Sequence, residues 1–203
     1  LATVADAFVI GEGEEVVQQI LDIVYAEPDK ESRLQKLAHT EGVYVPKYYE
    51  PQFADAPTAD VLANADFSAQ YLGLTPTADV PATIRRQWVR EIDAYPHTTA
   101  IMTSDTEFQD MFIVETARGC GRHCRFCMAG YCFRKPRPRA LANIIADIEK
   151  RPARTKKIGL MGAAVSDHPQ IDELVTYLDD NNIKFSVASL RADRLSPHLA
   201  QAL

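Results

Sequence analysis

Three cysteines share one short segment of this chain, Glu115-Thr116-Ala117-Arg118-Gly119-Cys120-Gly121-Arg122-His123-Cys124-Arg125-Phe126-Cys127. The segment follows an apolar run, Met111 to Val114, which predicts a buried strand that ends in a glycine-rich turn. The cysteines are therefore expected on a loop at the carboxyl end of a strand. Gly119 and Gly121 allow backbone conformations that residues with a Cβ resist, so this loop can bend around a ligand.

The spacing of Cys120, Cys124 and Cys127, C-x3-C-x2-C, points to a metal centre with an open position. A structural zinc site usually takes four protein ligands, whereas a catalytic one keeps a position open. A cubane iron–sulfur cluster normally takes four cysteines, one for each iron. With three thiolates, one iron keeps a free coordination position, where a substrate or cofactor can bind.

Cys132 follows at C-x4-C and keeps two alternatives open. All four cysteines could form a zinc-stabilised binding module that contacts RNA or another polyanion, although the separated C-x2-C pairs of common zinc ribbons are missing. An iron–sulfur electron carrier is the second alternative. Disulfides are disfavoured because no secretory segment is visible and reducing compartments keep thiols free, so we expect a cytoplasmic protein. Cys132 itself is expected to be a small buried residue.

The composition is that of a globular protein. The 203 residues are 46% hydrophobic and 25% charged, and no apolar run approaches the ~20 residues that a membrane helix needs. The net charge of −6 argues against nonspecific nucleic-acid binding by the whole chain.

Positive charge nevertheless gathers around the cysteines. Residues 116–146 contain no Asp or Glu but seven cations: Arg118, Arg122, Arg125, Arg134, Lys135, Arg137 and Arg139. Cations near a thiol favour the thiolate. A solvated basic loop is an alternative interpretation. A contact with phosphate or RNA is another, because aromatic residues interleave with the cations.

After residue 110 the pattern alternates between strand and helix. We expect strands at Phe112–Glu115, Lys157–Met161 and Phe185–Ala188. Apolar spacing predicts helices over Leu141–Ile148 and from Asp167-His168-Pro169 to Leu178, and Ser196-Pro197 begins another. Such alternation favours parallel strands whose catalytic loops lie at their carboxyl ends.

The first half of the chain is less regular. Phe8–Ile10 predicts a strand, and a helix is expected from Val16 to Val24. Further expectations are a helix over Ser32–Ala38, an extended segment over Gly42–Pro46 and a helix over Asp60–Tyr71. His97 is expected at the surface.

Cys120, Cys124 and Cys127, with Phe126 before the last of them, resemble the C-x3-C-x-aromatic-C signature of radical S-adenosylmethionine enzymes. In that family the three thiolates hold a 4Fe–4S cluster whose fourth iron is chelated by S-adenosylmethionine. The resemblance implies an enzyme that forms a 5′-deoxyadenosyl radical for hydrogen abstraction, methylation or sulfur insertion on a substrate that the motifs do not specify. It also implies an electron donor such as flavodoxin or ferredoxin.

The string from Glu115 to Arg139 resembles a subgroup with an N-terminal cobalamin-binding domain. Gly11-Glu12-Gly13-Glu14 resembles a segment near the end of such domains, in which the glycines (here Gly11 and Gly13) lie against the cobalamin tail. The histidine motif that ligates cobalt is not found in this chain, so any binding of cobalamin is expected in the full-length protein only.

The resemblance implies an α/β fold in three parts. Residues 1–27 would be the end of a Rossmann-like domain, 28–109 an irregular connector, and 110–203 the first half of a radical S-adenosylmethionine barrel. Because such barrels usually have six βα units and this chain holds about three, we expect a fragment with little turnover of its own. Its start at Leu1 fits that expectation.

The resemblance also assigns roles around the cofactor. The Phe126 backbone would lie near the adenine. In the family, a Gly-Gly-Glu segment commonly contacts the amino group of S-adenosylmethionine. Gly162-Ala163-Ala164 occupies the corresponding place in this chain and lacks the acid. Ser189 and Arg191, after the third strand, would reach the carboxylate of S-adenosylmethionine or a substrate anion.

Overall fold

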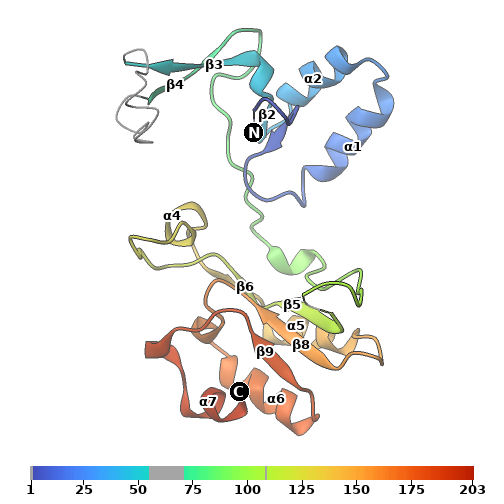
Figure 1. Cartoon of the computed structure of the whole chain (residues 1–203), viewed down its shortest axis with the longest axis vertical. Coiled ribbons are helices and arrows are strands. Elements are labelled where there is room, and N and C mark those ends of the chain that lie inside the picture. The colour runs from blue at the N-terminus through green and yellow to red at the C-terminus, as the bar shows by residue number, and fades with distance from the viewer. Residues whose placement is uncertain (1, 55–70, 108) are drawn as a thin grey trace. The chain divides into compact units, whose positions relative to one another are not determined.

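The computed structural model describes residues 2–54, 71–107 and 109–203 (Figure 1). The chain divides into two compact units, Leu1–Arg90 and Glu91–Leu203. This division follows contacts within the chain and differs from the boundaries after residues 27 and 109 that the resemblance implies. The whole cysteine segment lies in the C-terminal unit.

The N-terminal unit contains short strands and two helices. Its elements are β1 (Phe8–Val9), α1 (Val17–Ala26), α2 (Lys30–Ala38), β2 (Val43–Tyr44), the 3-10 helix η1 (Pro46–Tyr48), β3 (Tyr49–Phe53) and β4 (Tyr71–Pro76). The predicted first strand, both predicted helices and the extended segment are confirmed. The helix expected over Asp60–Tyr71 lies outside the described residues, except for Tyr71, which is the first residue of β4.

The strands of this unit pair antiparallel, β1 with β2 and β3 with β4. A Rossmann-like remnant is therefore a prediction that these described strands do not confirm. Helix α2 begins where the Asp29 side chain accepts a hydrogen bond from the Ser32 amide at 2.8 Å, a standard N-cap. Its apolar face, with Leu34 and Leu37, packs into the core of the unit.

The segment after β1 contacts a distant part of the same unit. Gly11 has a φ of +111°, and a Cβ there would lie 2.2 Å from the backbone oxygen of Gln87, so a side chain is excluded. The buried carboxylate of Glu12 accepts a hydrogen bond from the Val89 amide at 2.7 Å. A Cβ on Gly13 would meet nothing within 4 Å. Gly11 and Glu12 thus hold the end of the unit in place.

The C-terminal unit is built on a parallel sheet. Its elements are the 3-10 helix η2 (Ile92–Ala94), β5 (Met111–Glu115), β6 (Ala117–Arg118), α4 (Ala129–Cys132), β7 (Arg137–Pro138), α5 (Leu141–Glu149), β8 (Lys157–Met161), η3 (Val165–Asp167), α6 (Ile171–Asp180), β9 (Phe185–Val187), η4 (Ala192–Arg194) and α7 (Pro197–Ala202). Strand β8 lies between β5 and β9, and both neighbours run parallel to it (Figure 1).

The predicted alternation is confirmed strand by strand, with one shifted helix start. Residues 165–167 form η3, and α6 begins only at Ile171. Pro169 explains the delay, because proline disfavours the α conformation of the residue before it. The sheet is compatible with a barrel segment, and closure into a barrel remains a prediction.

The core lies between the sheet and its helices. Ile144, Ile148, Ile158, Leu160 and Leu174 are among its fully buried side chains, and they come from α5, β8 and α6. In β8, Ile158 and Leu160 are fully buried, whereas Met161 at its carboxyl end is exposed. None of the helices among the described residues is long and apolar enough to cross a lipid bilayer.

A two-stranded stem carries the cysteines. Strands β6 and β7 pair antiparallel, Ala117 with Pro138 and Arg118 with Arg137. We call β6 and β7 the stem, and residues 119–136 between them the cysteine loop. The stem follows directly after β5, so the loop begins at the carboxyl edge of the parallel sheet.

Candidate functional site

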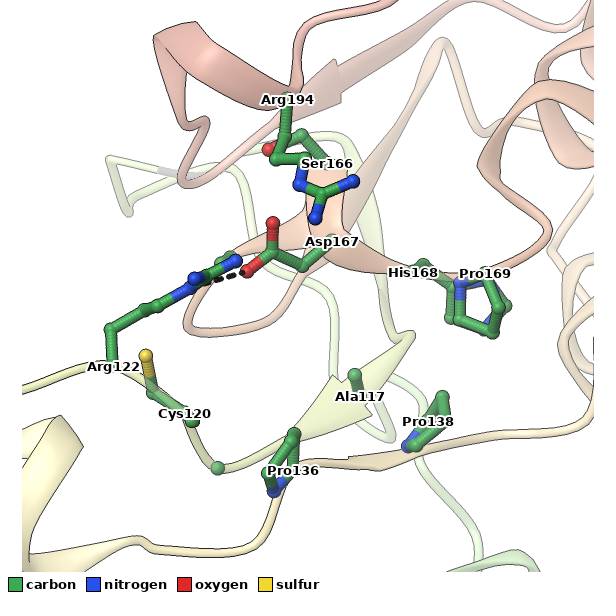
Figure 2. A pocket seen from close by; sticks show the side chains of 13 residues that line it. Ala117, Cys120, Arg122, Pro136, Pro138, Ser166, Asp167, His168, Pro169 and Arg194 are labelled. Carbon is green, nitrogen blue, oxygen red and sulfur yellow. Dashed lines mark ion pairs between the residues drawn. The ribbon is translucent and has the colours of Figure 1, made fainter.

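A pocket of about 480 Å³ opens at the carboxyl ends of the parallel strands (Figure 2). All three loops that leave these ends contribute to it: the cysteine loop after β5, the η3 loop after β8 and the η4 segment after β9. Its lining consists of Ala117, Gly119, Cys120, Gly121, Arg122, Pro136, Pro138, Ala164, Ser166, Asp167, His168, Pro169 and Arg194. This is the sheet edge at which the alternating pattern predicts chemistry.

The three signature cysteines are free thiols, and one of them lies at this pocket. Cys120 lines it, half-buried, whereas Cys124 is exposed and Cys127 is half-buried. Cys124 and Cys127 are joined by a turn in which the Cys127 amide donates to the Cys124 carbonyl at 3.0 Å. Within the described parts of the chain, no three His, Cys, Asp or Glu side chains converge closely enough to hold a metal ion. Three cysteine thiols are chemically suited to hold an iron–sulfur cluster. In this structure, however, their sulfur atoms do not converge on one point.

Two glycines allow the cysteine loop to fold back on itself. Gly119 has a φ of +88°, and a Cβ there would lie 2.5 Å from the Phe133 carbonyl oxygen. That same oxygen accepts a hydrogen bond from the Cys120 amide at 2.9 Å. Gly130, in α4, packs so tightly that a Cβ would lie 1.8 Å from the Arg122 carbonyl oxygen. The backbone between the cysteines is thus fixed by close contacts that only glycine permits.

Asp167 connects the three loops by ion pairs. Its carboxylate accepts two hydrogen bonds from Arg191 Nη1, at 2.8 and 2.9 Å. It also lies 3.8 Å from Arg122 Nε (Figure 2). Arg191 also pairs with Asp193. The hydrogen bonds that Arg191 donates to Asp167 are the main cause that raises the pKa of Arg191 above its usual value, and Cys120 contributes a smaller electrostatic part. Asp167 thereby links the third loop to the cysteine loop.

The predicted residues of the second and third loops hold those loops together. The Ser189 hydroxyl donates to the Ala163 carbonyl at 3.1 Å, and the Arg191 amide donates to Ser166 Oγ at 2.9 Å. A Cβ on Gly162 would lie 3.2 Å from Thr116 Oγ1, so this glycine lets the second loop approach the end of β5. Their predicted contacts with S-adenosylmethionine stay predictions.

Sequence reasoning did not single out two polar residues of the pocket, His168 and Arg194. His168 is buried between two backbone groups, since its Nδ1 accepts from the Gln170 amide at 3.1 Å and its Nε2 lies 3.0 Å from the Arg139 carbonyl. That arrangement suits a neutral ring with its proton on Nε2. Arg194 could have been suspected from its place after the third strand, but charged residues at loops are common.

Two expectations about single residues were wrong. Cys132 is exposed rather than buried, because it ends the short helix α4 on the outside of the loop. His97 is buried rather than exposed, and its Nδ1 lies 2.8 Å from Glu115 Oε2. Phe126 is 93% exposed and does not line the pocket, so its role near the adenine stays a prediction.

The basic segment divides into two groups. Arg118, Arg122 and Arg139 form ion pairs with acids from outside the segment. Arg125, Arg134 and Lys135 are exposed on the cysteine loop, and Arg122 is exposed as well. The interpretation as a solvated basic loop therefore does not apply to Arg139, which is 3% exposed.

The comparisons with known proteins add two findings. A family model described as "Radical SAM proteins, N-terminal" matches residues 1–46. An uncharacterized protein of Methanocaldococcus jannaschii is 34% identical over 114 residues, which is 55% of this chain. The chain spans about a quarter of that relative, 26% of its length. The family match supports the radical S-adenosylmethionine superfamily, and it does not show the cobalamin-binding subgroup.

The matched residues are separate from the cysteine motif. They cover β1, α1, α2 and β2 of the N-terminal unit, whereas the three cysteines lie beyond residue 119. The family match therefore does not test the cysteine motif, whose resemblance to the same superfamily stays a prediction.

Proposed function

We propose that this chain is part of a radical S-adenosylmethionine enzyme, in which Cys120, Cys124 and Cys127 hold a 4Fe–4S cluster. The observation that carries the proposal is the position of Cys120. It lines a pocket at the carboxyl edge of a parallel sheet, on a loop that contains the other two thiols. When bound, the cluster and S-adenosylmethionine would supply reductive cleavage to a 5′-deoxyadenosyl radical, for hydrogen abstraction, methylation or sulfur insertion.

The residues of the pocket suit a ligand that bears both an ammonium and a carboxylate. Arg191 is already occupied by Asp167 and Asp193, so Arg194 is the better candidate to bind the carboxylate. Asp167 is the candidate acid for the ammonium, because each carboxylate oxygen can accept more than one hydrogen bond. It would replace the acid that Gly162-Ala163-Ala164 lacks.

The proposal does not assign cobalamin to this chain. At Gly11, where the resemblance would place the cobalamin tail, the backbone of Gln87 already lies within contact distance. An external electron donor remains part of the proposal, since the cluster must be reduced by another protein such as flavodoxin or ferredoxin.

Metal identity and stoichiometry test the proposal against a zinc module. The chain would be reconstituted without oxygen in iron and sulfide, in parallel with Cys124→Ala and Cys132→Ala. We expect about four irons per chain in the wild type. Cys124→Ala should lose the cluster, and Cys132→Ala should retain it.

One tightly bound zinc, lost equally in both variants, would overturn the proposal in favour of a four-cysteine zinc site. Binding of RNA that depends on that zinc would further support the module that contacts a polyanion.

A further inference from the structure

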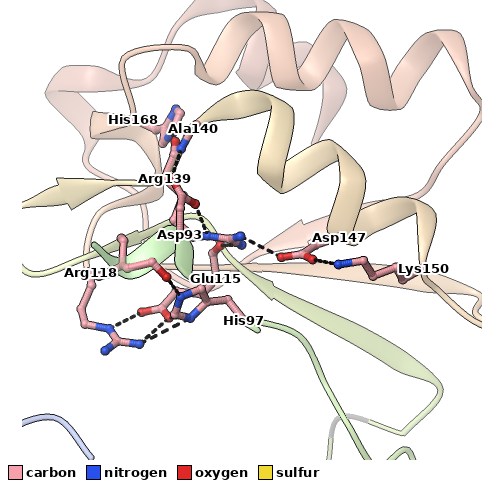
Figure 3. Close-up of polar contacts among 10 residues, drawn as sticks. Asp93, His97, Glu115, Arg118, Arg139, Ala140, Asp147, Lys150 and His168 are labelled. Carbon is pink, nitrogen blue, oxygen red and sulfur yellow. Dashed lines mark hydrogen bonds and ion pairs between the residues drawn. The ribbon is translucent and has the colours of Figure 1, made fainter. Parts of the chain in front are cut away.

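The stem of the cysteine loop is flanked by two clusters of polar side chains (Figure 3). One cluster surrounds Arg118, where the chain enters the loop. The other surrounds Arg139, directly after the chain leaves it. Neither cluster contains a cysteine or lines the pocket with a charged group, so neither is explained by ligand binding alone.

The entry cluster joins Arg118 to Glu115 and His97. Arg118 donates from Nε to Glu115 Oε1 at 3.0 Å and from Nη2 to Glu115 Oε2 at 2.9 Å. This is a bidentate pair, the strongest form of an ion pair between these groups. His97 contacts the same carboxylate through Nδ1, and its Nε2 faces the Ile92 carbonyl. The start of the loop is thereby bound to the end of β5.

The exit cluster uses all three nitrogens of the Arg139 guanidinium. Nε donates to Asp93 at 2.9 Å, Nη2 pairs with Asp147 at 2.8 Å, and Nη1 donates to the Glu115 carbonyl at 3.1 Å. Arg139 and Asp147 are both buried. Burying such charges costs free energy that is recovered only if the partners are held in good geometry. Arg139 is therefore a fixed point directly after the stem.

Glu115 belongs to both clusters. Its carboxylate binds the entry cluster, and its backbone oxygen accepts from Arg139 in the exit cluster. The Arg139 amide also donates to the Thr116 carbonyl at 3.0 Å, which continues the pairing of the stem. One residue at the carboxyl end of β5 thus holds both ends of the cysteine loop.

We propose that Glu115, Arg118 and Arg139 are positioning residues for the cysteine loop. They fix both ends of residues 119–136 against β5, and so keep Cys120 at the rim of the pocket while the rest of the loop closes around its ligand. The inference rests on the proposed function only for the identity of that ligand. The restraint itself belongs to the chain without cofactor.

Two variants and one control test this restraint. Arg118→Gln removes the bidentate pair. Arg139→Lys keeps a cation at this position but replaces the planar fork of three nitrogens by a single ammonium nitrogen, which lacks the geometry to bind Asp93, Asp147 and the Glu115 carbonyl together. Lys150→Gln is the matched control, because Lys150 also pairs with Asp147, at 2.7 Å, but is exposed and does not touch the stem. All three remove or change a cation in the same network.

The first readout is hydrogen exchange in the chain without metal. The amides of Cys120 and residue 139 report on the loop and stem, because they donate to Phe133 and Thr116. We expect both to exchange at least about tenfold faster in Arg118→Gln and Arg139→Lys, since hydrogen bonds to charged groups are strong. Exchange in β8 and the urea midpoint serve as measures of global folding.

The second readout is iron retained per chain after reconstitution. We expect both stem variants to retain less than half of the iron of the wild type, and Lys150→Gln to equal it. Unchanged amide exchange in both stem variants would overturn the inference. A wild type that binds no iron, with faster exchange in the stem variants, would instead overturn the proposed function and leave the restraint standing.

Discussion

Replacing Gly130 by alanine should disturb the cysteine loop without removing a ligand or a charge. A Cβ at this position would lie 1.8 Å from the Arg122 carbonyl oxygen, whereas real Cβ contacts are essentially never under 3.0 Å. The backbone at Arg122 or in α4 must therefore move by more than an ångström. Alanine itself favours helix, and Gly130 has no left-handed φ, so the overlap is the sole cause of strain.

The magnitude follows from the cost of overpacking. Inserting a methyl group into a tightly packed position typically costs about 1–3 kcal/mol, which corresponds to about a 5- to 150-fold change in a local opening equilibrium. Gly130 lies outside the apolar core of the C-terminal unit. The strain should therefore open the loop, and the midpoint of global unfolding should change little.

Gly121→Ala is the matched control, because a Cβ there would make ordinary contacts of 3.5 and 3.6 Å with Pro136. Hydrogen exchange at the Cys132 amide, which donates to Met128 at 2.8 Å, measures the opening of α4. We expect faster exchange and lower iron retention in Gly130→Ala alone. Equal behaviour of the two variants would refute the reasoning that this glycine contact shapes the loop.

Three further predictions concern stability. Gly11→Ala should destabilise the N-terminal unit in urea, because of its positive φ and its contact with a backbone oxygen, whereas Gly13→Ala should be neutral. Leu174→Ala should cost the C-terminal unit about 2–5 kcal/mol in the same assay, since this side chain is fully buried; a loss below about 1 kcal/mol would contradict the packing. Burial alone would raise the pKa of Asp147, but hydrogen bonds from its two cationic neighbours outweigh it and leave the pKa below the usual 3.8. Its contribution to stability is therefore complete above that value and lost as the pH falls through the lower folded pKa, so Asp147→Asn should flatten the acid limb of the stability profile.

Local patterns predicted the elements that position the site. Apolar runs located β5 and β8, helical spacing located α5 and α6, and the carboxyl edge of the sheet followed from their alternation. These features depend on neighbours in the sequence, or on a rule of chain topology that holds for most parallel sheets. The cysteine spacing likewise predicted a loop at this edge of the sheet.

Long-range partners could not be predicted in this way. Arg139 belongs to a run of cations, and nothing local indicates that its charge is matched by Asp93 and Asp147. His97 lies in an irregular segment, and its burial depends on Glu115 at the end of β5. Such pairs form only once the fold has brought distant segments together. The one available signal was that an acid-free run of cations needs counter-charges from elsewhere.

The central claim is an iron–sulfur cluster with an open iron that binds S-adenosylmethionine. Electron paramagnetic resonance of the reduced, reconstituted chain, recorded with and without S-adenosylmethionine, tests it most directly. We expect a cluster signal that changes when S-adenosylmethionine is added. Addition of the same volume of buffer should leave the signal unchanged. A cluster signal that is identical in both samples would contradict the account and favour an iron–sulfur electron carrier.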